Sequence, residues 1–119
     1  MALLTFDADT FEQRVLAGKE PAVISFLTDW CGPCGLQRKT FQRLADEEPA
    51  DSPVLIGGID ADQCGALCDR FGVRTLPSTL IFAEGEVLEM LVGYQSGEYL
   101  KSYVEYLARE KAGPKPDQS

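Results

Sequence analysis

The chain has 119 residues, the size of a single domain, and its 45% hydrophobic content is enough for one buried core. The net charge of −8 disfavours nucleic-acid binding, which needs clustered Lys and Arg, and the lack of histidine excludes histidine-based acid–base catalysis and the common histidine-containing zinc sites. No apolar run is long enough to span a bilayer, and residues 1–20 lack the positive start and apolar core of a secretion signal. We therefore expect a cytoplasmic protein without a membrane partner.

The first half of the chain predicts three strands and two helices. A possible capping box at Thr10 and Gln13 marks the start of the first helix. The second helix should bury Leu36, Phe41 and Leu44, which lie at helical spacing. The predicted elements are strands at residues 3–6, 22–28 and 54–60, and helices at residues 10–17 and 31–48.

The second half predicts two helices and a hairpin. Glu84-Gly85 separates two apolar runs, as in a β-hairpin, and Ser96 can cap the last helix, which Gly113-Pro114 should stop. The predicted elements are a helix at residues 63–71, strands at 78–83 and 86–92, and the helix after Ser96. The order βαβαβαββα predicts an α/β domain at residues 1–112, with one mixed five-stranded sheet between about four helices, and a disordered tail at 113–119.

Cys31 and Cys34 lie where a predicted buried strand is followed by a helix. Two cysteines at this spacing can form and break a disulfide with little backbone movement. The free amides and dipole of a helix N-terminus favour a thiolate, which is the form that attacks a disulfide. Gly32 would let a substrate approach closely, and Pro33 would restrain the loop and begin the helix. The pattern therefore predicts redox chemistry.

Trp30-Cys31-Gly32-Pro33-Cys34 reproduces the active-site motif of the thioredoxin family, which the chain resembles along nearly its whole length. Residues 71–78, FGVRTLPS, are similar to the family segment that ends in a cis-proline opposite the dithiol. Val92-Gly93-Tyr94 matches the place where the family has a glycine in its substrate groove. These three matches occur in the family's order, so the resemblance implies the thioredoxin fold.

The resemblance also implies a role for each matched residue. Cys31 would be the attacking thiolate and Cys34 the buried resolving thiol, while Pro77, in the cis form, would present the backbone of Leu76 to an extended substrate. The implied apolar docking surface consists of Trp30, Gly32, Pro33, Leu76, Pro77, Gly93 and Tyr94.

The function that the resemblance implies is the reduction of protein disulfides by a cytoplasmic, monomeric thiol–disulfide oxidoreductase. It would need no bound cofactor or metal besides the redox-active Cys31–Cys34 disulfide. Thioredoxin reductase, a flavoprotein that uses NADPH, would recharge it, and its substrates would be disulfide-containing proteins. Two alternatives remain open: a specialised member that serves a dedicated partner or reductase, and a redox-sensing binding module.

The chain departs from the family pattern around the motif. Ser25 occupies the position of a buried aspartate that is thought to help deprotonate the resolving cysteine, and Ile56 replaces a lysine that often neighbours it. Gly35 follows the motif where relatives often have Lys or Arg. Loss of both members of a buried ion pair can be neutral for stability, but we expect a kinetic effect on the resolving step.

Cys64 and Cys68 form a second pair, spaced four residues apart on a predicted helix. With Leu67 and Phe71 they form an apolar stripe, so they could be small core residues or a regulatory thiol pair. A metal or iron–sulfur site made from all four cysteines is a third interpretation, which their nonstandard spacing disfavours.

Overall fold

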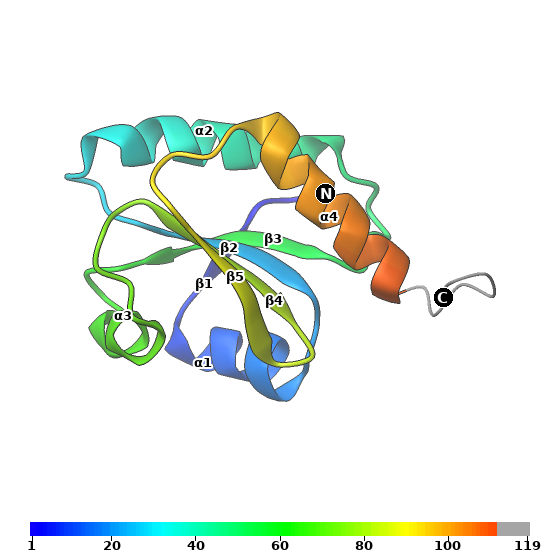
Figure 1. The fold of residues 1–119 in the computed structure, drawn as a ribbon, viewed down its shortest axis with the longest axis horizontal. Coiled ribbons are helices and arrows are strands. Elements are labelled where there is room, and N and C mark those ends of the chain that lie inside the picture. The colour runs from blue at the N-terminus through cyan, green and yellow to red at the C-terminus, as the bar shows by residue number, and fades with distance from the viewer. Residues whose placement is uncertain (112–119) are drawn as a thin grey trace.

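A computed structural model describes residues 1–111 and confirms the predicted order of strands and helices (Figure 1). The strands are β1 (Leu4–Phe6), β2 (Ala22–Leu27), β3 (Leu55–Asp60), β4 (Ser78–Ala83) and β5 (Glu86–Val92). The helices are α1 (Ala8–Phe11), its π-helical continuation η1 (Glu12–Ala17), α2 (Gly32–Glu47), α3 (Gly65–Phe71) and α4 (Gly97–Lys111). The tail and the Gly113-Pro114 helix stop lie outside the described residues.

The five strands form one mixed sheet in the order β1-β3-β2-β4-β5. β1 and β2 both run parallel to β3, whereas β4 is antiparallel to both of its neighbours. Helices α2 and α4 cover one face of the sheet and α1 and α3 cover the other (Figure 1). Every residue of the central strand β2 is buried, as the nearly unbroken apolar run at residues 22–28 predicts for a strand covered on both faces.

Each face of the sheet has its own apolar core. On the face covered by α1 and α3, the rings of Phe11, Phe71 and Phe82 contact one another edge to face, with centroids 5.3 to 5.8 Å apart. On the opposite face, Val23 of β2 and Ile56 of β3 pack with Phe41 of α2 and Leu100 of α4. Because side chains alternate along a strand, Ser25 points to this second face with Val23.

The first helix begins earlier than the sequence predicts. Asp7, not Thr10, is the N-cap: its carboxylate accepts a hydrogen bond from the Thr10 backbone N–H at 2.8 Å. The Thr10 hydroxyl in turn accepts from the Asp7 backbone N–H at 3.0 Å, which completes a capping box. The predicted box at Thr10 and Gln13 is therefore wrong, because Thr10 is already occupied as the third residue of the helix.

The prediction that Leu36 faces the core is also wrong, since its side chain is 56% exposed. The buried side of α2 is formed by Cys34, Gln37, Phe41, Leu44 and Ala45. Gln37 replaces Leu36 on this stripe because adjacent residues point about 100° apart around a helix. The burial of Phe41 and Leu44 is confirmed.

The ends of the last two helices follow the predicted signals more closely. α3 ends at Gly72, whose φ of 72° is a left-handed conformation that glycine adopts readily. The Ser96 hydroxyl accepts a hydrogen bond from the Tyr99 backbone N–H at 3.2 Å, as expected of a cap of α4.

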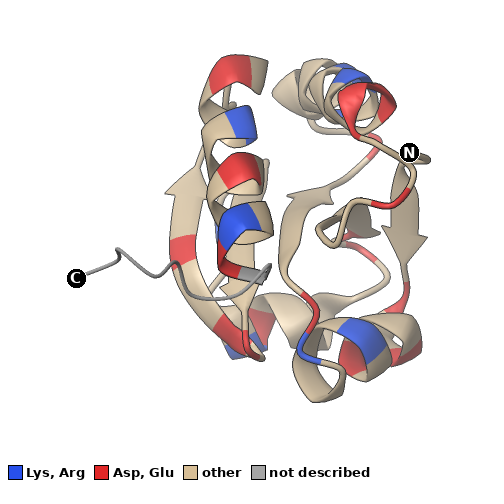
Figure 2. Ribbon diagram, turned by 90° about the vertical axis from the view of Figure 1, so that its right-hand side faces the viewer, with Lys and Arg blue, Asp and Glu red and all other residues tan. Residues whose placement is uncertain are grey.

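Acidic and basic residues alternate along the outer side of α4 (Figure 2). In residues 1–111 no helix is long and apolar enough to cross a membrane.

Candidate active site

Three of the singled-out segments meet at one end of the sheet. Phe26 pairs with Ser78, and Ser78 pairs with Val92, so the end of β2, the start of β4 and the end of β5 lie in register. The Trp30–Cys34 segment follows β2, Pro77 precedes β4, and Gly93 follows β5. The topology therefore brings together the three family motifs.

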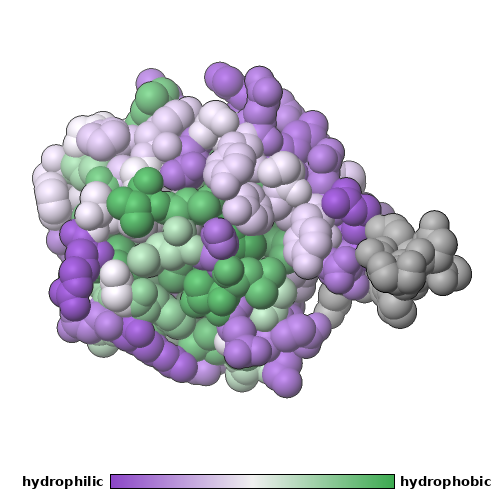
Figure 3. All heavy atoms as spheres, viewed as in Figure 1, coloured by the Kyte–Doolittle hydropathy of each residue, from purple (hydrophilic) through white to green (hydrophobic). Residues whose placement is uncertain are grey.

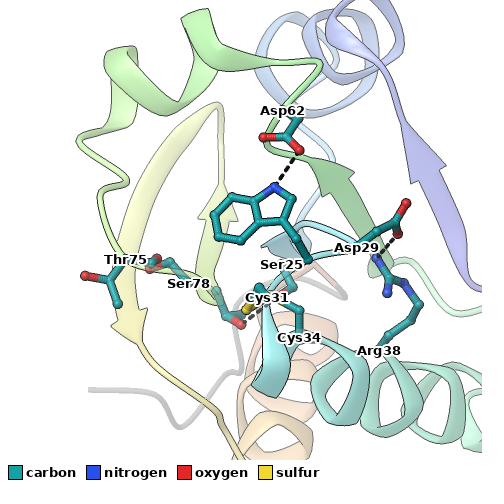
Figure 4. Close-up of a disulfide and its surroundings, with 10 residues drawn as sticks. Ser25, Asp29, Cys31, Cys34, Arg38, Asp62, Thr75 and Ser78 are labelled. Atoms are coloured by element: carbon teal, nitrogen blue, oxygen red, sulfur yellow. Dashed lines mark hydrogen bonds and ion pairs between the residues drawn. A yellow bond between two sulfur atoms is a disulfide. The ribbon is translucent and has the colours of Figure 1, made fainter.

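Cys31 and Cys34 are joined by a disulfide at the start of α2, with their Cα atoms 5.3 Å apart (Figure 4). Cys31 is the N-cap of α2 and is partly exposed, whereas Cys34 is completely buried. Gly32 and Pro33 form the exposed first turn between them. A sulfur at the N-cap lies beside the unpaired amides of the first helical turn, which stabilise a negative charge.

The Trp30 side chain is 69% exposed and is held by one hydrogen bond. Its indole Nε1 donates to Oδ2 of Asp62 at 2.7 Å (Figure 4). Asp62 follows β3 and belongs to none of the three sequence motifs. The available signal was topological, because residues that follow two neighbouring parallel strands meet at the same end of a sheet.

Pro77 and Gly93 are linked directly, since the Gly93 N–H donates to the Pro77 carbonyl at 2.8 Å. The Leu76–Pro77 peptide bond is cis, as the resemblance implies. Pro77 is buried and Leu76 half-buried, while Gly93 has a φ of 89°. Beside them, Tyr94 is 41% exposed.

Exposed apolar residues continue from this end along the edge strand β5, where Figure 3 shows apolar side chains gathered on the viewed face. Val92, directly before Gly93, is 55% exposed, and Met90 is 42% exposed. The sequence pattern predicts a strand at both residues but does not predict their exposure, because β5 looks like any apolar strand.

Comparison with known proteins decides the family. The sequence profile described as Thioredoxin matches residues 2–106, most of the chain. The chain belongs to the thioredoxin family. It is 29% identical over 101 residues to the thioredoxin of Alicyclobacillus acidocaldarius, which covers 85% of this chain and 93% of that protein.

Two further relatives agree with this assignment. A solved structure of a mutant thioredoxin from Halobacterium salinarum superposes with a TM-score of 0.76 at 30% identity, covering 90% of this chain and 91% of that one. The chain is also 36% identical over 115 residues to a protein disulfide-isomerase of Neurospora crassa, covering 96% of this chain but 30% of that longer protein. The thioredoxin fold and the cysteine pair make this chain a dithiol–disulfide oxidoreductase.

Ser25 and Ile56, where the sequence departs from the resemblance, are both fully buried. The Ser25 hydroxyl accepts a hydrogen bond from Thr79 Oγ1 at 3.4 Å. Val23 pairs with Ile56, and Ser25 pairs with Gly58, so Ser25 and Ile56 are diagonal neighbours on the face that α2 covers. Both positions are therefore uncharged: residue 25 carries a hydroxyl and residue 56 an aliphatic side chain.

The second cysteine pair lies at the start of α3, away from the helix that carries the dithiol. Cys64 is buried and is the N-cap of α3, which begins at Gly65. The prediction that both cysteines lie within one helix is therefore wrong for Cys64 and right for Cys68. Cys68 is half-buried, and its thiol donates to the Ala61 carbonyl at 3.8 Å. Both thiols are free and pack against the core with Leu67 and Phe71, as the apolar stripe predicts.

The surroundings of both thiols disfavour ionisation. Burial, with the negative charge of Asp60 adding to it, raises the pKa of Cys64 above its usual range. Burial and the nearby Asp69 do the same for Cys68. Within residues 1–111, no three His, Cys, Asp or Glu side chains are close enough to hold a metal ion, so the four cysteines are not gathered into one site.

Proposed function

We propose that this chain reduces the disulfides of partner proteins in the cytoplasm, with Cys31 as the attacking thiolate and Cys34 as the resolving thiol. The observation that carries the proposal is the difference in burial between the two residues. Cys34 is completely buried, whereas Cys31 is partly exposed at the N-cap of α2. A substrate disulfide can therefore reach the sulfur of Cys31 more easily than that of Cys34.

The reaction proceeds in two exchange steps. The Cys31 thiolate attacks one sulfur of the substrate, a mixed disulfide forms, and the second substrate sulfur leaves as a thiolate that takes up a proton. Cys34 then loses its proton and attacks Cys31 Sγ, which releases the first substrate sulfur and forms the Cys31–Cys34 disulfide. The substrate gains two electrons, and the dithiol loses two. The Cα separation of 5.3 Å keeps the resolving thiol close to the mixed disulfide.

The exposed surface around Cys31 provides the docking site in this proposal. Trp30, Gly32 and Pro33 border it on one side, and Leu76, Pro77 and Gly93 on the other, because the ends of β2, β4 and β5 lie in register. Tyr94 follows Gly93, and its hydroxyl is bonded to Thr40 of α2. An extended substrate segment would pair with the backbone of Leu76, next to the cis bond. The exposed apolar rings of Trp30 and Tyr94 supply contact area that a protein substrate can bury.

A flavoprotein reductase that uses NADPH would return the two electrons, and the protein would work as a monomer without a bound cofactor. The second candidate is a specialised thioredoxin that serves a dedicated partner or reductase. The buried hydroxyl of Ser25 favours it, because no carboxylate is present at this position to accept the proton of Cys34. Gly35, which adds no charge beside the dithiol, points in the same direction.

Insulin reduction with dithiothreitol as the electron donor tests the proposal. Wild type should accelerate the reaction, and Cys31→Ser should abolish the acceleration. If Cys31→Ser remains active, the assigned role of Cys31 is wrong. Replacing dithiothreitol with NADPH and a general thioredoxin reductase separates the two candidates, since a dedicated thioredoxin would be recharged poorly.

A further inference from the structure

A reciprocal pair of hydrogen bonds ties α2 to the loop after β5. Nε2 of Gln37 donates to the backbone carbonyl of Gln95 at 2.9 Å, and Oε1 of Gln37 accepts from the Gln95 backbone N–H at 2.7 Å. Gln37 is completely buried and lies three residues after Cys34, on the same side of α2. Its side chain thus satisfies both backbone groups of one loop residue.

Other contacts hold the same loop in place. The side-chain amide of Gln95 donates to the carbonyls of Gly93, at 3.2 Å, and Val92, at 3.3 Å. The hydroxyls of Thr40, on the next turn of α2, and Tyr94 are hydrogen-bonded at 2.7 Å. On its other side the loop is joined to the Pro77 carbonyl through the Gly93 N–H. The segment with Gly93 and Tyr94 is therefore fixed between α2 and the cis-proline loop.

A glutamine is an unusual choice for this position, because the neighbouring buried residues of α2 are apolar, as in Phe41 and Leu44. A buried amide is tolerated when its hydrogen bonds are satisfied, and it then specifies one arrangement of the groups it joins. An apolar side chain at residue 37 could fill the same space but could not fix the position of the Gln95 backbone.

We propose that Gln37 is a positioning residue that holds Gly93 and Tyr94 at a fixed place relative to the dithiol and thereby sets the affinity for protein disulfides. This inference rests on the proposed function, in which Gly93 and Tyr94 line the substrate groove. A loop that is already ordered does not have to lose conformational freedom when substrate binds. The sulfur chemistry of Cys31 and Cys34 does not depend on the loop, so Gln37 acts on KM for large substrates.

The test compares Gln37→Met with a matched control, Gln42→Met, on the outer side of the same helix. Among residues 1–111, the side chain of Gln42 bonds only to Asp46, one turn away. Insulin serves as the large substrate and cystine as the small one. For Gln37→Met we expect KM for insulin to rise about tenfold, the equivalent of about 1.4 kcal/mol, with kcat for insulin and the rate with cystine unchanged. Gln42→Met should match wild type on both substrates.

Two further measurements keep the test independent of folding defects. The Gln95 amide should exchange its hydrogen faster in Gln37→Met than in wild type, because its acceptor is gone. Thr40→Val, a nearly isosteric change at a half-buried position, should raise KM for insulin in the same direction by a smaller factor.

An unchanged KM for insulin despite faster exchange at Gln95 would overturn the inference, and so would an equal loss of rate with cystine. If wild type itself fails to reduce insulin while it reduces cystine, the proposed function fails first, and the role of Gln37 in binding protein substrates fails with it.

Discussion

Trp30 and Asp62 are joined by a hydrogen bond of 2.7 Å, from the indole Nε1 to Oδ2 of the carboxylate. These residues lie 32 positions apart in the sequence but follow two neighbouring parallel strands, β2 and β3. Because the Trp30 ring is 69% exposed, few packing contacts can orient it, and the bond to Asp62 fixes its direction beside Cys31.

Asp62→Ala should therefore release the ring. Trp30 is the only tryptophan of the chain, so fluorescence anisotropy reports on it alone and should fall in this variant. Loss of one hydrogen bond to a charged group should weaken substrate binding by about 1 kcal/mol, or about fivefold in KM for insulin. Asp51→Ala, in the exposed loop before β3, is the control and should change neither quantity. Unchanged anisotropy in Asp62→Ala would show that the ring is held in another way.

Ser25→Asp should speed up the resolving step and destabilise the fold. A carboxylate here would face α2, where it could accept the proton of Cys34, but Ile56 offers it no positive charge. A buried carboxylate without a partner should lower the free energy of unfolding by about 3 kcal/mol. Single-turnover kinetics at pH 6 to 9 (about the range in which thiols begin to ionise) measure the first effect, and urea unfolding measures the second. An unchanged rate across this range would refute the kinetic role of residue 25.

The double variant Ser25→Asp with Ile56→Lys is the control for this prediction. It places opposite charges on diagonal neighbours of the same sheet face, and it should regain part of the lost stability. If the double variant is no more stable than Ser25→Asp alone, the two positions do not interact.

Gly57 and Gly58 are adjacent glycines in β3 that differ in how much space a Cβ atom would have. A Cβ added at Gly57 would lie 2.7 Å from Cε2 of Phe6 and 2.8 Å from the Leu4 carbonyl oxygen, both in β1. A Cβ at Gly58 would meet only Leu27 Cδ1, at 3.4 Å, and the Ser25 carbonyl oxygen, at 3.6 Å. Gly57→Ala should thus cost about 2 kcal/mol of stability, as overpacking does, and Gly58→Ala much less. Equal costs in urea unfolding would contradict the close approach of β1 to β3.

Much of this fold is predictable because its signals are local. The run at residues 22–28 is apolar except for Ser25 and Thr28, which predicts burial on both faces, and Glu84-Gly85 between two apolar runs predicts the hairpin of β4 and β5. The dithiol is equally local, since the two residues between its cysteines and its place between a strand and a helix are visible in the sequence.

The parts that sequence patterns miss depend on partners far along the chain. Leu36 and Gln37 are adjacent, and hydrophobicity favours burying Leu36, but the backbone of Gln95 offers partners only to the residue on the inner side of α2. Asp7 and Thr10 can each cap a helix, and in the structure they form one capping box with Asp7 as the N-cap. The helix begins there because β1 ends at Phe6, directly before Asp7.

The thiols of Cys64 and Cys68 should react slowly with iodoacetamide at neutral pH. The pKa of each is raised by burial, so the thiolate population is smaller than that of an ordinary cysteine, and the rate should keep rising with pH beyond the ordinary thiol range. Because the pKa of each thiol is raised in the folded state, the folded protein holds the thiol proton more tightly than the unfolded chain does. The resulting contribution to the free energy of unfolding is fully present below the unfolded-state pKa and is lost as pH rises through the folded-state pKa. Rapid alkylation at neutral pH, followed by mass spectrometry, would instead favour the regulatory interpretation.

The direct test of the account is to trap the mixed disulfide. Cys34→Ser lacks the resolving thiol, so when it is reduced and mixed with a disulfide-containing protein such as insulin it should accumulate a covalent adduct through Cys31, visible by mass spectrometry. Cys31→Ser, which retains only the fully buried Cys34 of this pair, should form almost none. Adducts of equal yield in the two variants, or adducts through Cys34 alone, would contradict the assignment of the attacking and resolving thiols.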